Sequence, residues 1–129
     1  AYVDMPIGQR VFLAQFDTIK EVAKEGTCVI VGRCADYALS EVADCINIFI
    51  YADLDVRIKR IMEKYNLSEK EAKDMIMKKD KQRASYYNYY SNKKWGQSSS
   101  YNLSIDSGVL GIDGTVELLK NFIDATGKN

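Results

Sequence analysis

Hydrophobic residues recur along most of the chain at a spacing that predicts four helices. Residues 10–25 carry apolar side chains at helical spacing and are followed by Gly26, a typical helix stop. Residues 54–65 repeat this spacing after Asp53, which we expect to cap the helix. A third helix is predicted over residues 68–91, opening with the Ser-Glu-Lys-Glu sequence of a capping box. Residues 113–125 form the fourth, with Ile112, Val116, Leu119 and Ile123 expected on its apolar stripe.

Three shorter runs, residues 28–31, 46–51 and 101–106, predict strands. The first two are apolar at nearly every position, which is typical of strands buried on both faces of a parallel sheet. Strands that alternate with helices indicate an α/β fold, so we expect a parallel sheet in a three-layer α/β/α arrangement. Three strands are few for such a sheet, and the chain opens on a helix. We therefore expect an N-terminal strand-loop-helix unit to be absent.

The composition is that of one soluble domain covering residues 1–129, with 47% hydrophobic and 28% charged residues. Lysine plus arginine equals aspartate plus glutamate, 18 each, so no overall field attracts nucleic acid or an anionic membrane. No apolar run reaches the ~20 residues that span a bilayer. We expect neither nucleic acid nor a membrane as a partner.

Cysteine and histidine usage narrows the chemistry. The cysteines Cys28, Cys34 and Cys45 form no Cys-x-x-Cys pair, and the chain has no histidine. We expect three reduced thiols, a cytoplasmic protein and no metal site. The missing histidine also removes the usual general base and every histidine-based triad.

The first candidate for ligand binding is the loop after the predicted strand 28–31. Arg33 and Asp36 lie there, where α/β sheets bind ligands at the carboxyl ends of their strands. The planar guanidinium of Arg33 matches phosphate or carboxylate oxygens. The alternative is a structural ion pair with Asp36 or Asp44.

The long helix offers the second candidate. Lys79 and Arg83 fall on the line that its apolar and aromatic residues mark as inward-facing, so they require carboxylates or a phosphate as partners. The alternative is a helix that leaves the body of the protein with solvated cations. Arg57, Arg60 and Lys64 lie opposite the apolar face of their helix, and their spacing alone predicts a solvated face.

The aromatic segment 86–90 with Trp95 could stack a nucleobase, but packing against a neighbouring layer is the interpretation we favour. Gly108, Gly111 and Gly114 match neither a phosphate loop nor a dinucleotide fingerprint, and they predict a turn and a cap. No Gly-x-x-x-x-Gly-Lys-Ser/Thr occurs in the chain.

Taken together and in their order, several segments resemble the cytidylate-kinase-like proteins of bacteria. The resemblance runs from about residue 12 to residue 123. Its segments are residues 29–36, residues 48–52 with Arg57 and Arg60 following, residues 80–87, Trp95 with Gly96, and residues 101–103.

The resemblance implies a P-loop kinase fold of the nucleoside-monophosphate-kinase type, which transfers a phosphoryl group from MgATP to CMP or a related acceptor. It implies that Arg33 contacts the acceptor monophosphate. Cys34 stands where the family has a base-reading aspartate, and Asp36, two positions later, is a carboxylate able to substitute. Arg57 and Arg60 are assigned to substrate binding on the same ground.

Residues 68–95 resemble the lid of these kinases, where Arg83 with Lys79 would balance charge on the transferring phosphates as catalytic residues. The family's first strand, phosphate loop and following helix would lie upstream of residue 1. We therefore expect the intact enzyme to use MgATP and this chain alone to bind none.

Two alternatives remain open at this point: a non-catalytic module that binds a nucleotide or a partner on a kinase-derived scaffold, and a P-loop phosphotransferase acting on another small acceptor. The absent strand would leave unpaired backbone groups along residues 29–31. We expect this edge to produce a homodimer or to hold a missing N-terminal fragment.

Overall fold

The computed structural model describes residues 5–42 and 44–127. It divides into two compact units, Ala1–Cys45 and Ile46–Asn129. The organisation of residues 1–129 as a single domain stays a prediction, and residues 1–4, 43, 128 and 129 of that range lie outside the described residues.

The first unit consists of α1 (Ile7–Lys24) and the short α2 (Ala35–Ala38). Phe12 and Ile19 are the buried residues of α1, in agreement with the predicted apolar stripe. Ile19 packs against Ala35 and Ala38 of α2 in one apolar cluster. Burial of this stripe against α2 gives the unit its small core.

The segment between these helices does not form the strand predicted over residues 28–31. Val29 and Val31 are 93% and 87% exposed, whereas Ile30 packs against the α1–α2 cluster. A strand exists only where a neighbour pairs with its backbone. Since the sheet of the described residues contains only β1 and β2, the prediction of a strand buried on both faces here was wrong.

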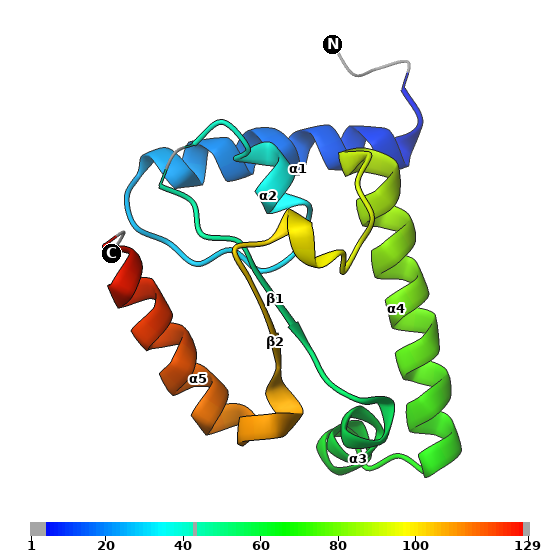
Figure 1. Cartoon of the computed structure of the whole chain (residues 1–129). Coiled ribbons are helices and arrows are strands. Elements are labelled where there is room, and N and C mark those ends of the chain that lie inside the picture. The colour runs from blue at the N-terminus through cyan, green and yellow to red at the C-terminus, as the bar shows by residue number, and fades with distance from the viewer. Residues whose placement is uncertain (1–4, 43, 128–129) are drawn as a thin grey trace. The chain divides into compact units, whose positions relative to one another are not determined.

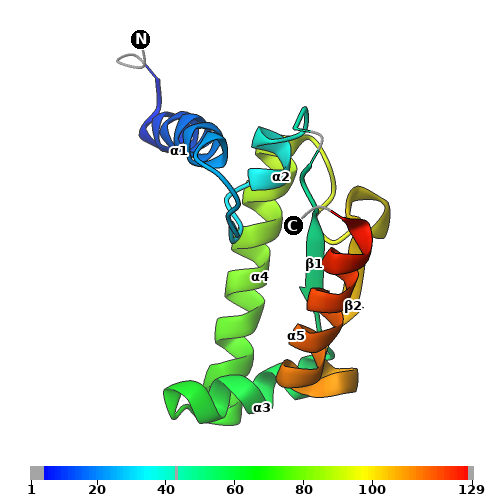
Figure 2. The same cartoon turned by 90° about the vertical axis from the view of Figure 1, so that its left-hand side faces the viewer.

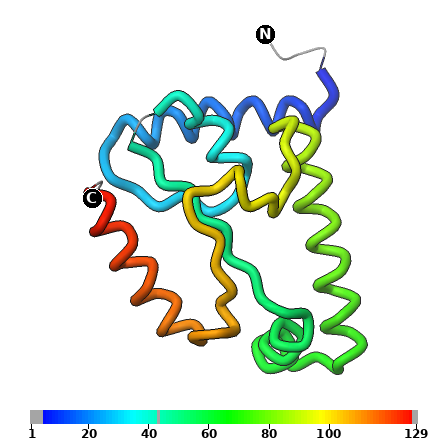
Figure 3. Tube along the Cα trace, in the orientation of Figure 1, coloured from blue at the N-terminus to red at the C-terminus, as the bar shows by residue number. Residues whose placement is uncertain are grey.

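The sheet described in the second unit consists of two short parallel strands, which lie side by side in Figures 1 and 3. Ile48 pairs with Leu103 and Tyr51 with Asp106. The elements of this second unit, in order, are β1 (Ile48–Tyr51), α3 (Leu54–Tyr65), α4 (Glu69–Ser91), the 3₁₀ turn η1 (Ser98–Ser100), β2 (Leu103–Asp106) and α5 (Ser107–Thr126).

This arrangement confirms an α/β fold with parallel strands. Within residues 46–127, α5 lies on one side of the strand pair and α4 on the other (Figures 1 and 2). The sheet of the described residues has two strands, so a full three-layer sheet is not seen. The two strands are only half-buried, and Ile50 is exposed. Burial of β1 on both faces, as its apolar run predicted, does not occur within this part of the chain.

Helix α4 begins at the predicted capping box. The Glu71 backbone N–H donates to Ser68 Oγ at 3.1 Å, and the Ser68 N–H donates to Glu71 Oε1 at 3.2 Å. Its first turns pack on α3 through Ile58, Ala72 and Ile76, which are buried together. This interface fixes where the rest of α4 lies relative to α3.

Helix α5 starts six residues earlier than predicted and is interrupted at Gly111. The φ of 73° and ψ of 178° at Gly111 are open only to glycine. Beyond the interruption Thr115 is buried, whereas Ile112 and Val116 are exposed, so the predicted apolar stripe is wrong for these two residues. The expected turn and cap are present, since Asp106 Oδ1 accepts from the Gly108 N–H at 2.8 Å.

An aromatic cluster connects the end of α4 to β1. The ring of Phe49 lies 5.3 Å from Trp95 and 5.0 Å from Tyr101, and Tyr101 lies 6.5 Å from Tyr87. A side chain at Gly96 would meet Phe49 at 3.3 Å, so glycine permits this close approach. Packing is therefore the observed role of these aromatic residues.

We predict that Ile76→Ala lowers the free energy of unfolding by about 2–4 kcal/mol, because it removes buried apolar atoms and leaves a cavity in the α3–α4 interface. Ile76 is 4% exposed, whereas Met77, next to it on α4, is 56% exposed. Met77→Ala is the matched control and should change stability by less than about 0.5 kcal/mol. Urea denaturation measures both, and equal losses would contradict the described interface.

Candidate functional site

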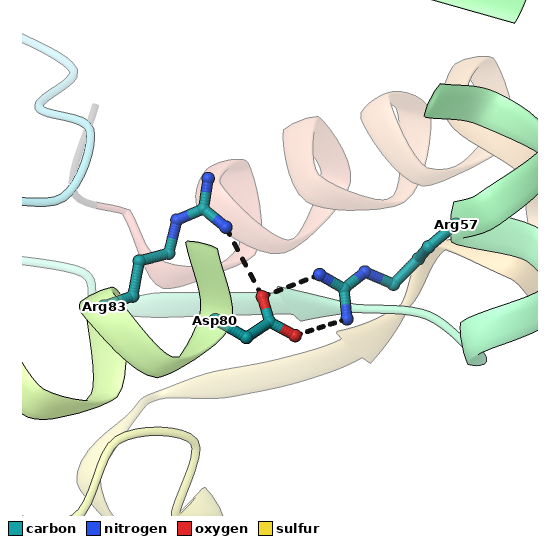
Figure 4. Close-up of polar contacts among 3 residues, drawn as sticks. All are labelled: Arg57, Asp80 and Arg83. Carbon is teal, nitrogen blue, oxygen red and sulfur yellow. Dashed lines mark hydrogen bonds and ion pairs between the residues drawn. The ribbon is translucent and has the colours of Figure 1, made fainter. Parts of the chain in front are cut away.

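Asp80, Arg57 and Arg83 form a charged cluster between α3 and α4 (Figure 4). Arg57 Nη1 donates to Asp80 Oδ2 and Arg57 Nη2 donates to Asp80 Oδ1, both at 2.7 Å. Arg83 Nη1 donates to the same Oδ1 at 3.4 Å. One carboxylate thus holds two guanidinium groups that come from different helices.

The two ion pairs of Asp80 differ in strength. The side chains of Arg57 and Asp80 are 30% and 26% exposed and meet in the bidentate geometry of the strong arginine–carboxylate pairs. The hydrogen bond from Arg57 to Asp80 raises the pKa of Arg57, which outweighs the opposing effect of its burial. Arg83 is 58% exposed and makes one longer contact, a geometry worth well under ~1 kcal/mol.

Arg60 binds the start of α5. Its Nη1 donates to Ser107 Oγ at 2.8 Å and its Nη2 donates to the Ser107 carbonyl at 3.0 Å. Ser107 Oγ in turn donates to the Tyr51 carbonyl at 3.2 Å. This chain of contacts joins α3 to the last residue of β1 and to the residue after β2.

The cluster and the Arg60 contacts lie at the same edge of the sheet. Arg57 belongs to the first turn of α3, which directly follows β1, and Ser107 directly follows β2. Both points are carboxyl ends of parallel strands, the edge at which open α/β sheets bind ligands. Within residues 46–127, this edge holds Arg57 and Arg60, and Arg83 of α4 is joined to Arg57 through Asp80.

The structure corrects two expectations about these cations. Arg57 and Arg60 are half-buried and hydrogen-bonded, so they are not a solvated face as their spacing predicted. Lys79 and Arg83 are exposed, so they do not face inward. The inward line of α4 passes through Ile76 instead and continues to Asp80, whose partial burial is compensated by Arg57.

Asp80 and Ser107 received no role from the sequence patterns, although both bind predicted site residues. Asp80 stands four residues after Ile76 on the buried face of α4, where a carboxylate requires a partner. Its partner Arg57 is 23 residues away. Ser107 could have been noticed because it follows the predicted strand 101–106 directly.

The loop of the first unit that carries Arg33 has an unusual backbone. Gly32, Arg33 and Cys34 follow one another with φ of 70°, 58° and 55°. The left-handed conformation costs non-glycine residues about 1–2 kcal/mol each. Strain of this kind persists at ligand-binding loops more often than elsewhere, so it supports a functional role for this loop.

Arg33 also lines a small, open hollow of about 250 Å³. The other residues of the hollow come from α1 and from Ile30, and its surface is mostly apolar. They are Ala14, Gln15, Thr18, Ile19 and Ile30. A second hollow, of about 350 Å³ between α3 and the start of α4, includes none of the predicted site residues.

Cys34 and Asp36 lie next to Arg33 at the start of α2. The Cys34 side chain is buried, which raises the pKa of its thiol to about 11, and the charge of Asp36 adds to the increase. Cys34 is therefore a neutral thiol at physiological pH. Asp36 Oδ1 accepts from the Tyr37 N–H at 2.8 Å.

In residues 5–42 and 44–127, no group of three cysteine, aspartate or glutamate side chains is placed to hold a metal ion. Among the helices of this same part, none combines the length and apolar character needed to cross a membrane.

Comparison with known proteins gives consistent matches. The sequence profile of the cytidylate kinase-like family matches residues 1–109. A cytidylate kinase of Staphylothermus marinus is 28% identical over 123 residues, and one of Methanocaldococcus jannaschii is 30% identical over 107 residues. The crystal structure of an uncharacterized protein from Eubacterium ventriosum superposes with a TM-score of 0.87 at 36% identity.

These matches cover more of this chain than of the relatives. The chain is covered to 95% and 81% by the two kinases but spans only 64% and 60% of their lengths. The crystal structure covers 96% of the chain, which in turn spans 70% of that protein. The relatives therefore contain a substantial part that has no counterpart in these 129 residues.

We predict that Cys34 is alkylated by iodoacetamide far more slowly than Cys28 at pH 8. With a pKa of about 11, only about one Cys34 thiol in a thousand is ionised there, and burial limits access further. Because the pKa is raised, the rate at Cys34 should continue to increase up to about pH 11. Cys28 is exposed and serves as the internal control. Peptide mass spectrometry measures both rates, and equal modification at pH 8 would contradict the described loop.

Proposed function

The chain belongs to the cytidylate kinase-like family, and from this premise we propose that it is part of a nucleoside-monophosphate kinase. The intact protein would transfer a phosphoryl group from ATP to CMP or a related acceptor. The observation that supports the proposal beyond the family is that Arg57 and Arg60 lie at the carboxyl ends of β1 and β2, with Arg83 joined to Arg57 through Asp80. That edge is where a nucleotide is expected in such a fold.

Phosphoryl transfer suits these side chains. The reaction requires accurate placement of two substrates and cations that stabilise charge on the transferring group, and it needs no histidine. In this proposal Arg83 and Lys79, one turn apart on the exposed side of α4, approach the transferring phosphates. Arg33 binds the acceptor monophosphate from its strained loop, and Asp36 contributes to acceptor recognition.

Binding of the β- and γ-phosphates of ATP and of its Mg²⁺ requires groups that are not found in these residues. The sequence contains no Gly-x-x-x-x-Gly-Lys-Ser/Thr, and the described residues offer no cluster for Mg²⁺. We therefore assign the binding of MgATP's β- and γ-phosphates and of the metal to a part of the protein outside these 129 residues. The chain's own share is to bind the acceptor and to supply arginine and lysine.

Because the phosphate-loop motif does not occur in these 129 residues, a second candidate function remains: a nucleotide-binding or partner-binding module without catalysis. The coding sequence upstream of Ala1 distinguishes the two. A phosphate loop within the preceding ~100 residues, the length of one further α/β unit with its linker, favours the kinase.

We predict that the protein encoded with its upstream sequence converts CMP and MgATP to CDP, and that Arg33→Ala raises its KM for CMP by about 10- to 100-fold. This factor corresponds to the ~1.5–3 kcal/mol of a charged hydrogen bond. Chromatographic separation of the nucleotides measures the product. The isolated 129-residue chain should form no CDP, since it lacks the groups that hold ATP.

Arg10→Ala is the matched control, because Arg10 is an exposed cation on α1 of the same unit. It should leave the KM for CMP unchanged. CDP formed by the isolated chain, or an unchanged KM in Arg33→Ala, would contradict this assignment.

We also predict that the isolated chain self-associates or carries a bound N-terminal fragment. Val29 and Val31 are almost fully exposed, and β1 exposes Ile50. Apolar surface of this kind beside unpaired backbone favours pairing with another strand. Light scattering at micromolar concentration should give at least a dimer, with mass spectrometry to detect a fragment. A monomer with nothing attached would contradict the proposed pairing.

A further inference from the structure

Asp80 contributes the same carboxylate oxygen to two arginines that hold it unequally. Arg57 reaches both oxygens at 2.7 Å, whereas Arg83 reaches Oδ1 alone at 3.4 Å. Arg57 and Asp80 are each less than a third exposed, and Arg83 is more than half exposed. The carboxylate is thus fixed by α3, and Arg83 is the partner that can leave.

Loss of Arg83 would not leave Asp80 without a partner. Removing one member of a partly buried ion pair is costly when the other charge stays behind unpaired. Here both oxygens of Asp80 would keep their bonds to Arg57. The exposed guanidinium of Arg83 can therefore exchange a single carboxylate contact for a better acceptor at little cost.

A phosphate group is such an acceptor. It offers more oxygens and more charge than a carboxylate, and guanidinium binds it in bidentate form. Arg83 stands one turn from Lys79 on the exposed side of α4, so a phosphate approaching from solvent meets two cations. Both Nη atoms of Arg57 already donate to Asp80, so Arg57 does not leave the carboxylate for a phosphate as Arg83 does.

We propose that Asp80 is an internal competitor for phosphate, a carboxylate held by Arg57 that occupies the guanidinium of Arg83 until a nucleotide phosphate displaces it. The proposal separates the two arginines that bind Asp80 into a positioning residue, Arg57, and an exchangeable phosphate ligand, Arg83. It rests on the proposed function in one respect, that the displacing anion is a nucleotide phosphate.

The test measures binding of inorganic tripolyphosphate to the 129-residue chain by calorimetry at ~0.1 M salt. Asp80→Asn keeps the shape of the side chain and removes the competing charge, so it should bind about fivefold more tightly than the unaltered chain, the factor of a single exposed charge pair. Arg83→Ala should bind more weakly, and Asp80→Asn combined with Arg83→Ala should lose the gain.

Asp74→Asn is the matched control. Asp74 lies on α4 as well, pairs with Lys70 at 3.0 Å and is well exposed, so its substitution removes the same charge from the same helix without touching the cluster. It should change the affinity by less than about twofold, because Asp74 is exposed to solvent and pairs with Lys70, not with either of the proposed phosphate ligands. An equal gain in Asp74→Asn would mean a general charge effect and would overturn the proposal.

A second measurement needs no substitution and so does not depend on whether Asp80→Asn folds. Nuclear magnetic resonance of the arginine Nε–Hε groups should show the Arg83 signal shifting as tripolyphosphate is added while the Arg57 signal stays. Equal shifts of both signals, no shift of Arg83, or no binding of tripolyphosphate would each overturn the proposal. Tighter binding in Asp80→Asn without CDP formation by the longer protein would refute the proposed kinase and leave this inference standing.

Discussion

Parallel pairing of β1 with β2 obliges the intervening chain to return to the starting end of the sheet before the second strand can begin. Residues 52–102 make this return as α3, α4 and the segment that follows. Since α3 leaves the carboxyl end of β1 and α5 leaves the carboxyl end of β2, the first turns of both helices meet at one edge. The register of eight paired residues therefore determines where Arg57, Arg60 and Ser107 lie.

The charged groups at this edge have both signs, and its arginines are held in different ways. Arg57 and Arg83 share the carboxylate of Asp80, and Arg60 is held by the hydroxyl and carbonyl of Ser107, which carry no charge. Asp53, Asp55 and Asp106 also lie at these strand ends. The edge therefore holds carboxylates beside its arginines, so an anion bound there would depend on individual guanidinium contacts and not on a net local charge.

The sequence predicted the helices well because their signals are local. The capping box at Ser68, the apolar stripe of α1 and the helix stop at Gly26 each depend on residues within a few turns. The strand predicted over residues 28–31 is not formed. An apolar run indicates that a segment tends to be buried, but a strand forms only where another strand pairs with its backbone. The role of Asp80 was missed for the same reason. Asp80 pairs with Arg57 across a helix–helix interface, and no local sequence pattern predicts such a contact.

In the proposed kinase, recognition of the acceptor base would be separate from binding of its phosphate. Guanidinium and ammonium groups bind phosphate whatever base is attached, so Arg33 and Arg83 in their proposed roles would serve any nucleotide acceptor. A base is distinguished by hydrogen bonds, and the position where the resemblance places a base-reading aspartate is Cys34. Because that thiol is buried and stays protonated at neutral pH, it cannot replace a carboxylate as a charged acceptor. Asp36 is the nearest carboxylate, two residues into the loop's helix, and a contact made from there requires the base to lie differently from one read at position 34.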